Sequence, residues 1–320
     1  MHRFLDSRTL LALGALWLII QTSLFFVFGV RHGHDTERYL AAADAILHGE
    51  IPLGKATSYM SYNLFVAAFR GTGLGEGGIV LAHVLLTGIA AIMLFRMGRR
   101  LFGAPAGVVA AFLYIAYLKL HPWNFFILTD SPFASLTIIA CGLLLESRRW
   151  WQWVGAFLIS IFAAFLRPNG FILLLATFVL LVFRLWTARR RIPSVLVVVA
   201  ALLLAPRFLQ LAKQMSTHET IGEYYRQGII IPGYERLRVS PPSTLRSFTP
   251  TPSDPFQDVL FVVRTEPWYA TKLALAKLAA FFLTVRPYHH VAYNVLIMAT
   301  LYPLYACAAV GLFRATSEGS

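Results

Sequence analysis

The chain has 320 residues, of which 58% are hydrophobic and only 13% are charged. Soluble domains average about 45–50% apolar and about 25% charged residues, and the mean hydropathy here is +0.64. With so little charge, a globule of this size could not cover its surface with polar groups, which excludes a soluble enzyme and a disordered chain. The composition predicts an all-α polytopic membrane protein.

The net charge of +13 is spread over short basic clusters between apolar segments. Clusters of this kind mark cytoplasmic loops under the positive-inside rule, and no polar domain carries a continuous basic face. Nucleic-acid binding is therefore not expected. The clusters are residues 96–100, 148–149 and 184–191.

The first predicted span is residues 9–30, behind a short basic start that favours a cytoplasmic N-terminus. Residues 31–76 are then expected outside. They hold two short stretches with apolar residues at helical spacing, one around Tyr39 and one around Tyr62. Both are too short for a bilayer, so we expect helices that lie at the membrane surface.

Seven further apolar segments are predicted to cross the membrane, and residues 268–283 form either a span or an interfacial helix. The total is eight spans, or nine if 268–283 crosses. The proline-rich segment 213–264 is expected to be an external loop with little regular structure. This gives a seven-span module (1–212), a polar loop (213–267) and a C-terminal part (268–320). The seven segments are 78–95, 104–118, 129–146, 151–166, 168–187, 193–212 and 291–313.

Acidic and basic side chains meet at the external ends of the predicted spans, which is where an active site is expected. Asp35, just outside the first span, is either a helix N-cap or a general base. Asp35, Arg38 and Tyr39 are spaced i, i+3 and i+4, so they can share one side of a short helix. The other members of the group are Glu37, Asp44, Glu50, Lys55, Glu76, Lys119, Asp130 and Arg167.

Two more of these residues have both a structural and a functional interpretation. Asp130 begins a span, with Pro132 in the first helical turn, and is either a cap or a site residue. Arg167, in a tight turn between two spans, is either a snorkelling arginine or a phosphate ligand. The histidine pairs at 32/34 and 289/290 lack partners at ligand spacing, so no metal site is expected.

Several motifs together resemble the GT-C glycosyltransferases, which include lipid A aminoarabinose transferases and protein O-mannosyltransferases. The strongest is GHDTERY at 33–39, which resembles the family's acidic motif after the first span, although many members carry adjacent Asp and Glu where Thr36 separates them here. The order and spacing of the motifs carry the resemblance. The others are 59–69, RRLFG at 99–103, LTD at 128–130, LRPNG at 166–170 and EPW at 266–268.

The resemblance implies an inverting membrane glycosyltransferase that takes a sugar from a polyprenyl-phosphate donor on the external, periplasmic face of a bacterial-type inner membrane. The acceptor would be a glycan, a lipid or a protein. Asp35 would take the acceptor's proton, and Asp130 would orient the site and help hold a divalent cation if one is used. The residues expected to bind substrate are Arg38, Tyr39, Lys55, Tyr59 and Arg167.

Two other functions stay open. A transporter or lipid flippase also carries charges at membrane depth, although the predicted spans are apolar at their centres. A scaffold subunit with this fold but without the chemistry is the second alternative. The segment 213–264 is either an acceptor-facing lid or a disordered spacer, and its tyrosines and arginines favour the lid because they can stack on sugar rings or pair with phosphate. They are Tyr224, Tyr225, Arg226, Tyr234, Arg236 and Arg238.

Overall fold

The computed structural model describes residues 2–146, 149–187, 221–231, 234–245, 255–283 and 290–318. By its internal contacts the chain divides into two units, Met1–Leu211 and Ala212–Ser320. Within the described ranges every regular element is a helix, and β pairing is limited to two isolated bridges. The predicted all-α class is therefore confirmed for this part of the chain.

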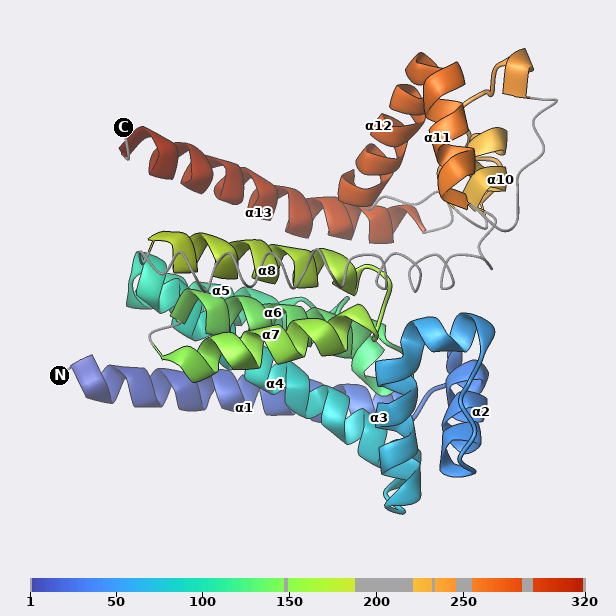
Figure 1. The fold of residues 1–320 in the computed structure, drawn as a ribbon. Coiled ribbons are helices and arrows are strands. Elements are labelled where there is room, and N and C mark those ends of the chain that lie inside the picture. The colour runs from blue at the N-terminus through green and yellow to red at the C-terminus, as the bar shows by residue number, and fades with distance from the viewer. Residues whose placement is uncertain are drawn as a thin grey trace. The chain divides into compact units, whose positions relative to one another are not determined.

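Six helices form the body of the first unit: α4 packs on both α5 and α6, α7 packs on α6, α8 packs on α7, and α1 packs on α5 (Figure 1). The close crossing of α4 and α5 depends on glycine, because a Cβ atom on Gly107 would lie 2.5 Å from the Phe95 carbonyl oxygen. Small residues allow such backbone approach between membrane helices. The six are α1 (His2–Phe28), α4 (Gly75–Phe102), α5 (Ala104–Ala116), α6 (Asp130–Glu146), α7 (Trp150–Ala164) and α8 (Gly170–Thr187).

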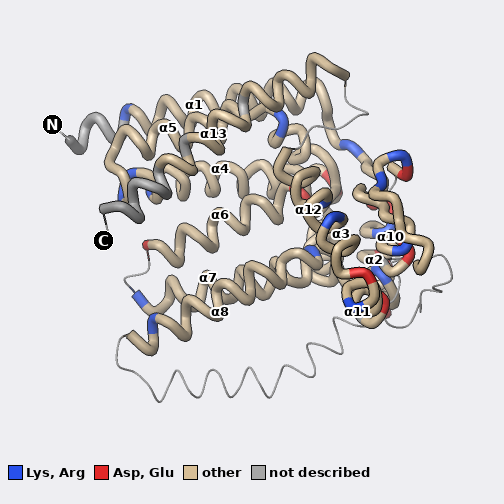
Figure 2. Tube along the Cα trace, turned by 90° about the horizontal axis from the view of Figure 1, so that it is seen from above, with Lys and Arg blue, Asp and Glu red and all other residues tan. Residues whose placement is uncertain are grey.

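Four helices in the described part are long and apolar enough to cross a membrane: Arg8–Phe28, Gly75–Phe102, Gly170–Thr187 and Val291–Val310. Two shorter apolar helices, α5 and α7, lie among them. Charged residues are missing from the middle of α4, α6, α7 and α8 (Figure 2). These helices support an integral membrane protein, while the total of eight or nine spans stays a prediction. The predicted span 193–212 lies outside the described residues.

The two short helices expected after the first span are α2 (Thr36–Leu47) and α3 (Met60–Gly71), with the 3₁₀-helix η1 (Gly54–Tyr59) between them. They stand at the end of the first unit where α1 ends (Figure 1). Their apolar faces meet in a core around Tyr39, Tyr62 and Val66. An ion pair of 3.0 Å between Asp44 Oδ1 and Arg70 Nη2 joins the two helices at their surface.

The second unit contains α10 (Ile221–Gln227), η3 (Ser243–Leu245), α11 (Pro255–Thr265), α12 (Pro267–Leu283) and α13 (Val291–Glu318). The expectation of little regular structure in 213–264 is wrong for its described part. Two prolines begin α11 and α12, a position at which proline is compatible with a helix. Leu245, Val262 and Leu273 then form a shared buried core. Residues 268–283 are helical, and whether they span the membrane stays untested.

Candidate functional site

Two loops far apart in sequence run side by side at the end of the first unit where α1 ends. Arg31 N–H donates to the Phe125 carbonyl oxygen at 2.8 Å, and Ile127 N–H donates to the Arg31 carbonyl oxygen at 3.1 Å. The first loop leads to Asp35 and the second to Asp130. This pairing brings the two predicted acidic residues into one region.

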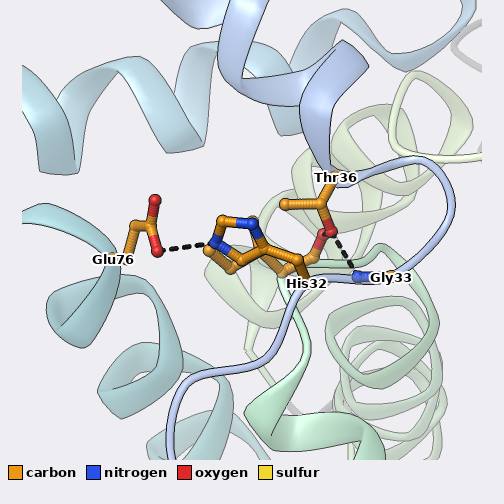
Figure 3. Close-up of polar contacts among 5 residues, drawn as sticks. His32, Gly33, Thr36 and Glu76 are labelled. Atoms are coloured by element: carbon orange, nitrogen blue, oxygen red, sulfur yellow. Dashed lines mark hydrogen bonds and ion pairs between the residues drawn. The ribbon is translucent and has the colours of Figure 1, made fainter.

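The Thr36 side chain joins the two loops by hydrogen bonds. Its hydroxyl accepts from Gly33 N–H at 2.8 Å (Figure 3) and donates to the Ile127 carbonyl oxygen at 3.0 Å. The side chain is fully buried. Gly33 permits the close approach, because a Cβ atom there would lie 2.7 Å from Leu128 Cδ1.

His32 attaches the same loop to the start of α4. Its Nε2 atom lies 2.9 Å from Glu76 Oε2 (Figure 3). The loop that carries Asp35 is therefore held by α4 as well as by the segment before α6.

Asp35 stands at the N-cap position of α2, but its side chain makes no capping hydrogen bond. The capping interpretation is therefore wrong. Asp35 Oδ1 instead lies 2.9 Å from Arg38 Nη1, and 42% of the Asp35 side chain is exposed. A partly exposed carboxylate on a fixed turn is accessible to a substrate hydroxyl.

Arg38 lies against two tyrosine rings. Its guanidinium carbon is 5.0 Å from the Tyr39 ring centre and 4.9 Å from the Tyr59 ring centre, which is cation–π geometry. Arg38 Nη2 also donates to the Tyr39 hydroxyl at 3.3 Å. The predicted grouping of Asp35, Arg38 and Tyr39 on one side of a helix is present, with Tyr59 added from η1.

Asp130, the first residue of α6, forms an ion pair with Arg167 Nη1. Arg167 lies in the turn between α7 and α8, where Gly170 N–H donates to the Arg167 carbonyl oxygen at 2.8 Å. Both side chains are partly exposed, Asp130 by 45% and Arg167 by 32%. Both residues were predicted at the ends of membrane spans, and they are direct partners although they are 37 positions apart in sequence.

Tyr39 lies beside the Asp35–Arg38 pair and bonds to the residue before Asp130. It is buried, its hydroxyl bonds with Thr129, and it lies near Asp35 and Arg38. Burial raises the pKa of Tyr39 to about 12, so the phenol is neutral at ordinary pH. Burial likewise raises the pKa of Tyr62, which is close enough to feel the charge of Asp130.

Lys55 is exposed in η1, the 3₁₀-helix that ends at Tyr59. Its place in the site rests on this position in the chain, and its role stays a prediction.

The carboxylates of the site face cations rather than one another. Across the residues that the structure describes, no group of three or more His, Cys, Asp or Glu side chains could hold a metal ion. Because Arg167 lies against Asp130, these residues form an ion pair and not a metal-binding cluster. A divalent cation at Asp130 stays a prediction without support from this arrangement.

A cavity of about 480 Å³ lies elsewhere, between α1, α4 and α5. Its walls are apolar and include Trp17, Gly88 and Phe95. This cavity is not at the ion pairs, and its lining offers no chemistry for group transfer.

The sequence-based prediction missed a buried polar cluster beside the site. Gln21, Thr87, His121, Asn124 and Ser131 are each at most 3% exposed and are joined by hydrogen bonds. A signal existed, because Gln21 is a polar residue inside an otherwise apolar span.

Residues 60–209 match the family model described as dolichyl-phosphate-mannose-protein mannosyltransferase. The matched stretch contains Asp130 and Arg167 and begins after Asp35, Arg38 and Tyr39. No curated protein and no solved structure matches the chain. The family match supports the resemblance to the GT-C superfamily and, with it, a membrane glycosyltransferase.

Proposed function

We propose that the protein transfers a sugar from a polyprenyl-phosphate donor to an acceptor at the external face of the membrane. One observation carries the proposal: Tyr39 lies beside the Asp35–Arg38 ion pair, and its hydroxyl bonds with Thr129, the residue before Asp130 of the Asp130–Arg167 pair. Transfer from a phosphate needs a base for the acceptor proton and cations for the departing phosphate. Both kinds of group are present in this region, on separate elements.

Arg38 would bind the donor by exchanging its carboxylate partner for the phosphate, whereas Arg167 would bind the phosphate while Asp130 holds the guanidinium. In the substrate-free protein Arg38 and Arg167 each lie against a carboxylate. An entering phosphate offers oxygens in the geometry that guanidinium groups bind in a bidentate manner. As Arg38 shifts to the phosphate, the Asp35 carboxylate becomes available to the acceptor. Lys55, exposed in η1, would add a third positive charge.

In the proposed reaction the acceptor hydroxyl gives its proton to Asp35 as its oxygen bonds to the anomeric carbon of the sugar. The bond between that carbon and the phosphate oxygen breaks, and its electron pair leaves with polyprenyl phosphate. Attack opposite to the leaving group inverts the anomeric centre. Arg167 and Arg38 would offset the charge that develops on the phosphate, and Asp130 would orient Arg167.

Tyr39 and Tyr59 would form the wall of this site. The two ring centres are 5.5 Å apart and both lie about 5 Å from the Arg38 guanidinium, so they cover one side of it and limit the directions in which it can move. Because Tyr39 remains a neutral phenol, it adds a hydrogen-bonding group to the site without adding a negative charge near the phosphate.

The proposal is tested by adding polyprenyl-phosphate sugars to the purified protein in lipid nanodiscs, together with glycan, lipid and peptide acceptors. We expect a glycosylated acceptor and one equivalent of free polyprenyl phosphate. Binding of the donor without release of polyprenyl phosphate would favour the non-catalytic scaffold instead. Movement of the intact donor across a sealed vesicle membrane would favour the transporter.

A further inference from the structure

Five buried polar side chains from four elements form a continuous hydrogen-bonded chain in the first unit. It begins at Ser131 in the first turn of α6 and passes to Asn124 in the 3₁₀-helix η2 (His121–Phe125). Asn124 Nδ2 donates to Gln21 Oε1 of α1 at 2.8 Å and lies 3.3 Å from Thr87 Oγ1 of α4. Gln21 Nε2 in turn lies 3.0 Å from His121 Nδ1.

One backbone carbonyl sets the direction of every bond in this chain. His121 Nε2 lies 3.0 Å from the Tyr114 carbonyl oxygen, which only accepts, so Nε2 carries the proton and Nδ1 accepts from Gln21. Gln21 must then present its oxygen to Asn124, and Asn124 must present its oxygen to Ser131. The Ser131 hydroxyl is therefore the donor.

The protonation of His121 agrees with this direction. Burial lowers the pKa of His121, so the ring stays neutral with a single proton on Nε2. A chain in which each donor has an acceptor holds its members in one arrangement.

The chain ends beside the site. Ser131 directly follows Asp130, and Thr129 on the other side bonds with Tyr39. A second branch leads from the Asn124 carbonyl oxygen to His83 Nδ1 at 3.3 Å, and His83 Nε2 lies 3.5 Å from the Tyr62 hydroxyl. The first turn of α6 is therefore fixed to α1 and α4 through Asn124, and to α2 through Tyr39.

We propose that Ser131 and Asn124 are positioning residues for Asp130. They hold the start of α6 so that the Asp130 carboxylate keeps the Arg167 guanidinium in place for the donor phosphate. Neither side chain can touch a substrate, because both are buried. The expected effect on catalysis rests on the proposed function. The positional statement, that Ser131 and Asn124 hold the start of α6, does not.

The test compares Ser131→Ala with Ser135→Ala, which removes an equally buried hydroxyl one turn further along α6. We expect kcat to fall about tenfold in Ser131→Ala, because small displacements of reacting groups cost rate steeply, and to stay near wild type in Ser135→Ala. In an Asp130→Asn background, Ser131→Ala should have no additional effect. Equal losses in both serine variants, or effects that multiply with Asp130→Asn, would overturn the inference.

Amide hydrogen exchange tests the positional statement without any activity assay. In the substrate-free protein, Ser131→Ala should raise exchange in residues 129–134, and Ser135→Ala should raise it less. Equal exchange in the two variants would overturn the inference whatever the activity. A wild-type protein that transfers no sugar would refute the proposed function and leave this measurement to decide the inference alone.

Discussion

The Thr36 hydroxyl donates to the Ile127 carbonyl oxygen and accepts from Gly33 N–H, and the side chain is fully buried. Where many GT-C members carry a second acid next to the first, this chain uses the position to join the Asp35 loop to the segment before Asp130. A glutamate at 36 would bury a charge at this position, and its carboxylate could not donate to the Ile127 carbonyl oxygen as the Thr36 hydroxyl does. The departure from the family pattern therefore has a structural reason.

Thr36→Val tests this role of the hydroxyl. The shape is kept, but Gly33 N–H and the Ile127 carbonyl oxygen lose a partner, which costs about 1–3 kcal/mol. We expect a lower melting temperature in detergent and a slower transfer reaction. Thr72→Val, at an exposed hydroxyl that follows α3 and bonds to the Ala68 carbonyl oxygen of that helix, is the control and should change neither. Equal melting temperatures for the two variants would refute the role.

Tyr39 makes a prediction about alkaline pH. Burial raises its pKa to about 12, against an ordinary value near 10, so the unfolded chain loses this proton first as the pH rises. The contribution of Tyr39 to stability is thus complete below pH 10 and is lost between pH 10 and about 12. Ultraviolet titration should show one fewer late-ionising tyrosine in Tyr39→Phe. If the titration step that disappears in Tyr39→Phe lies near pH 10, the argument that burial raises the pKa of Tyr39 is contradicted.

At the scale of elements, two ion pairs of nearly equal exposure have different expected roles. Arg167–Asp130 joins the α7–α8 turn to α6, and Arg70–Asp44 joins α3 to α2. Partly exposed pairs contribute about 0–1 kcal/mol to stability, so neither is expected to matter much for folding. Only the first includes Asp130, which directly follows the Thr129 that bonds with Tyr39, so the second serves as a matched control.

Arg167→Lys should raise the KM for the donor about tenfold, because lysine cannot reproduce the forked hydrogen bonds of a guanidinium to phosphate. Arg70→Lys should leave kinetics unchanged, and both variants should melt near the wild-type temperature. The measurement is a donor titration at saturating acceptor. Equal KM values for both variants would remove Arg167 from the donor site.

Local patterns predicted some elements well. The spacing of Tyr39 and Tyr62 with their apolar neighbours indicated α2 and α3, and the i, i+3, i+4 spacing grouped Asp35 with Arg38. From the sequence, Asp130 and Arg167 could be predicted only to lie at the same depth in the membrane. Whether they contact each other depends on how α6, α7 and α8 pack. No local pattern encodes that packing.

The errors also have physical causes. Prolines in 213–264 indicated irregular structure, but Pro255 begins α11, where a missing N–H costs nothing. The hydrogen-bonded chain from Ser131 to His121 was missed because, apart from Gln21 in its apolar span, each member alone is an ordinary polar residue. Its meaning depends on the meeting of α1, α4, η2 and α6.

At the scale of the whole molecule, the first unit contains every residue proposed for the chemistry, and the second unit contains a small packed core of its own. We expect the segment 213–264 to act as a lid that meets the acceptor. Added donor should then slow its proteolysis, because closure over the substrate would shield the segment from the protease. Equal cleavage with and without donor would make it a spacer.

The central claim is that Asp35 is the general base of a sugar transfer, and the comparison of Asp35→Asn with Glu37→Gln tests it most directly. Each variant removes one carboxylate charge from the same short region, and Glu37 is exposed and two residues away. With both variants inserted and folded as the wild type, Asp35→Asn should lose at least about 100-fold in kcat, the usual contribution of a general base, while Glu37→Gln keeps its rate. A wild-type kcat in Asp35→Asn would contradict the account.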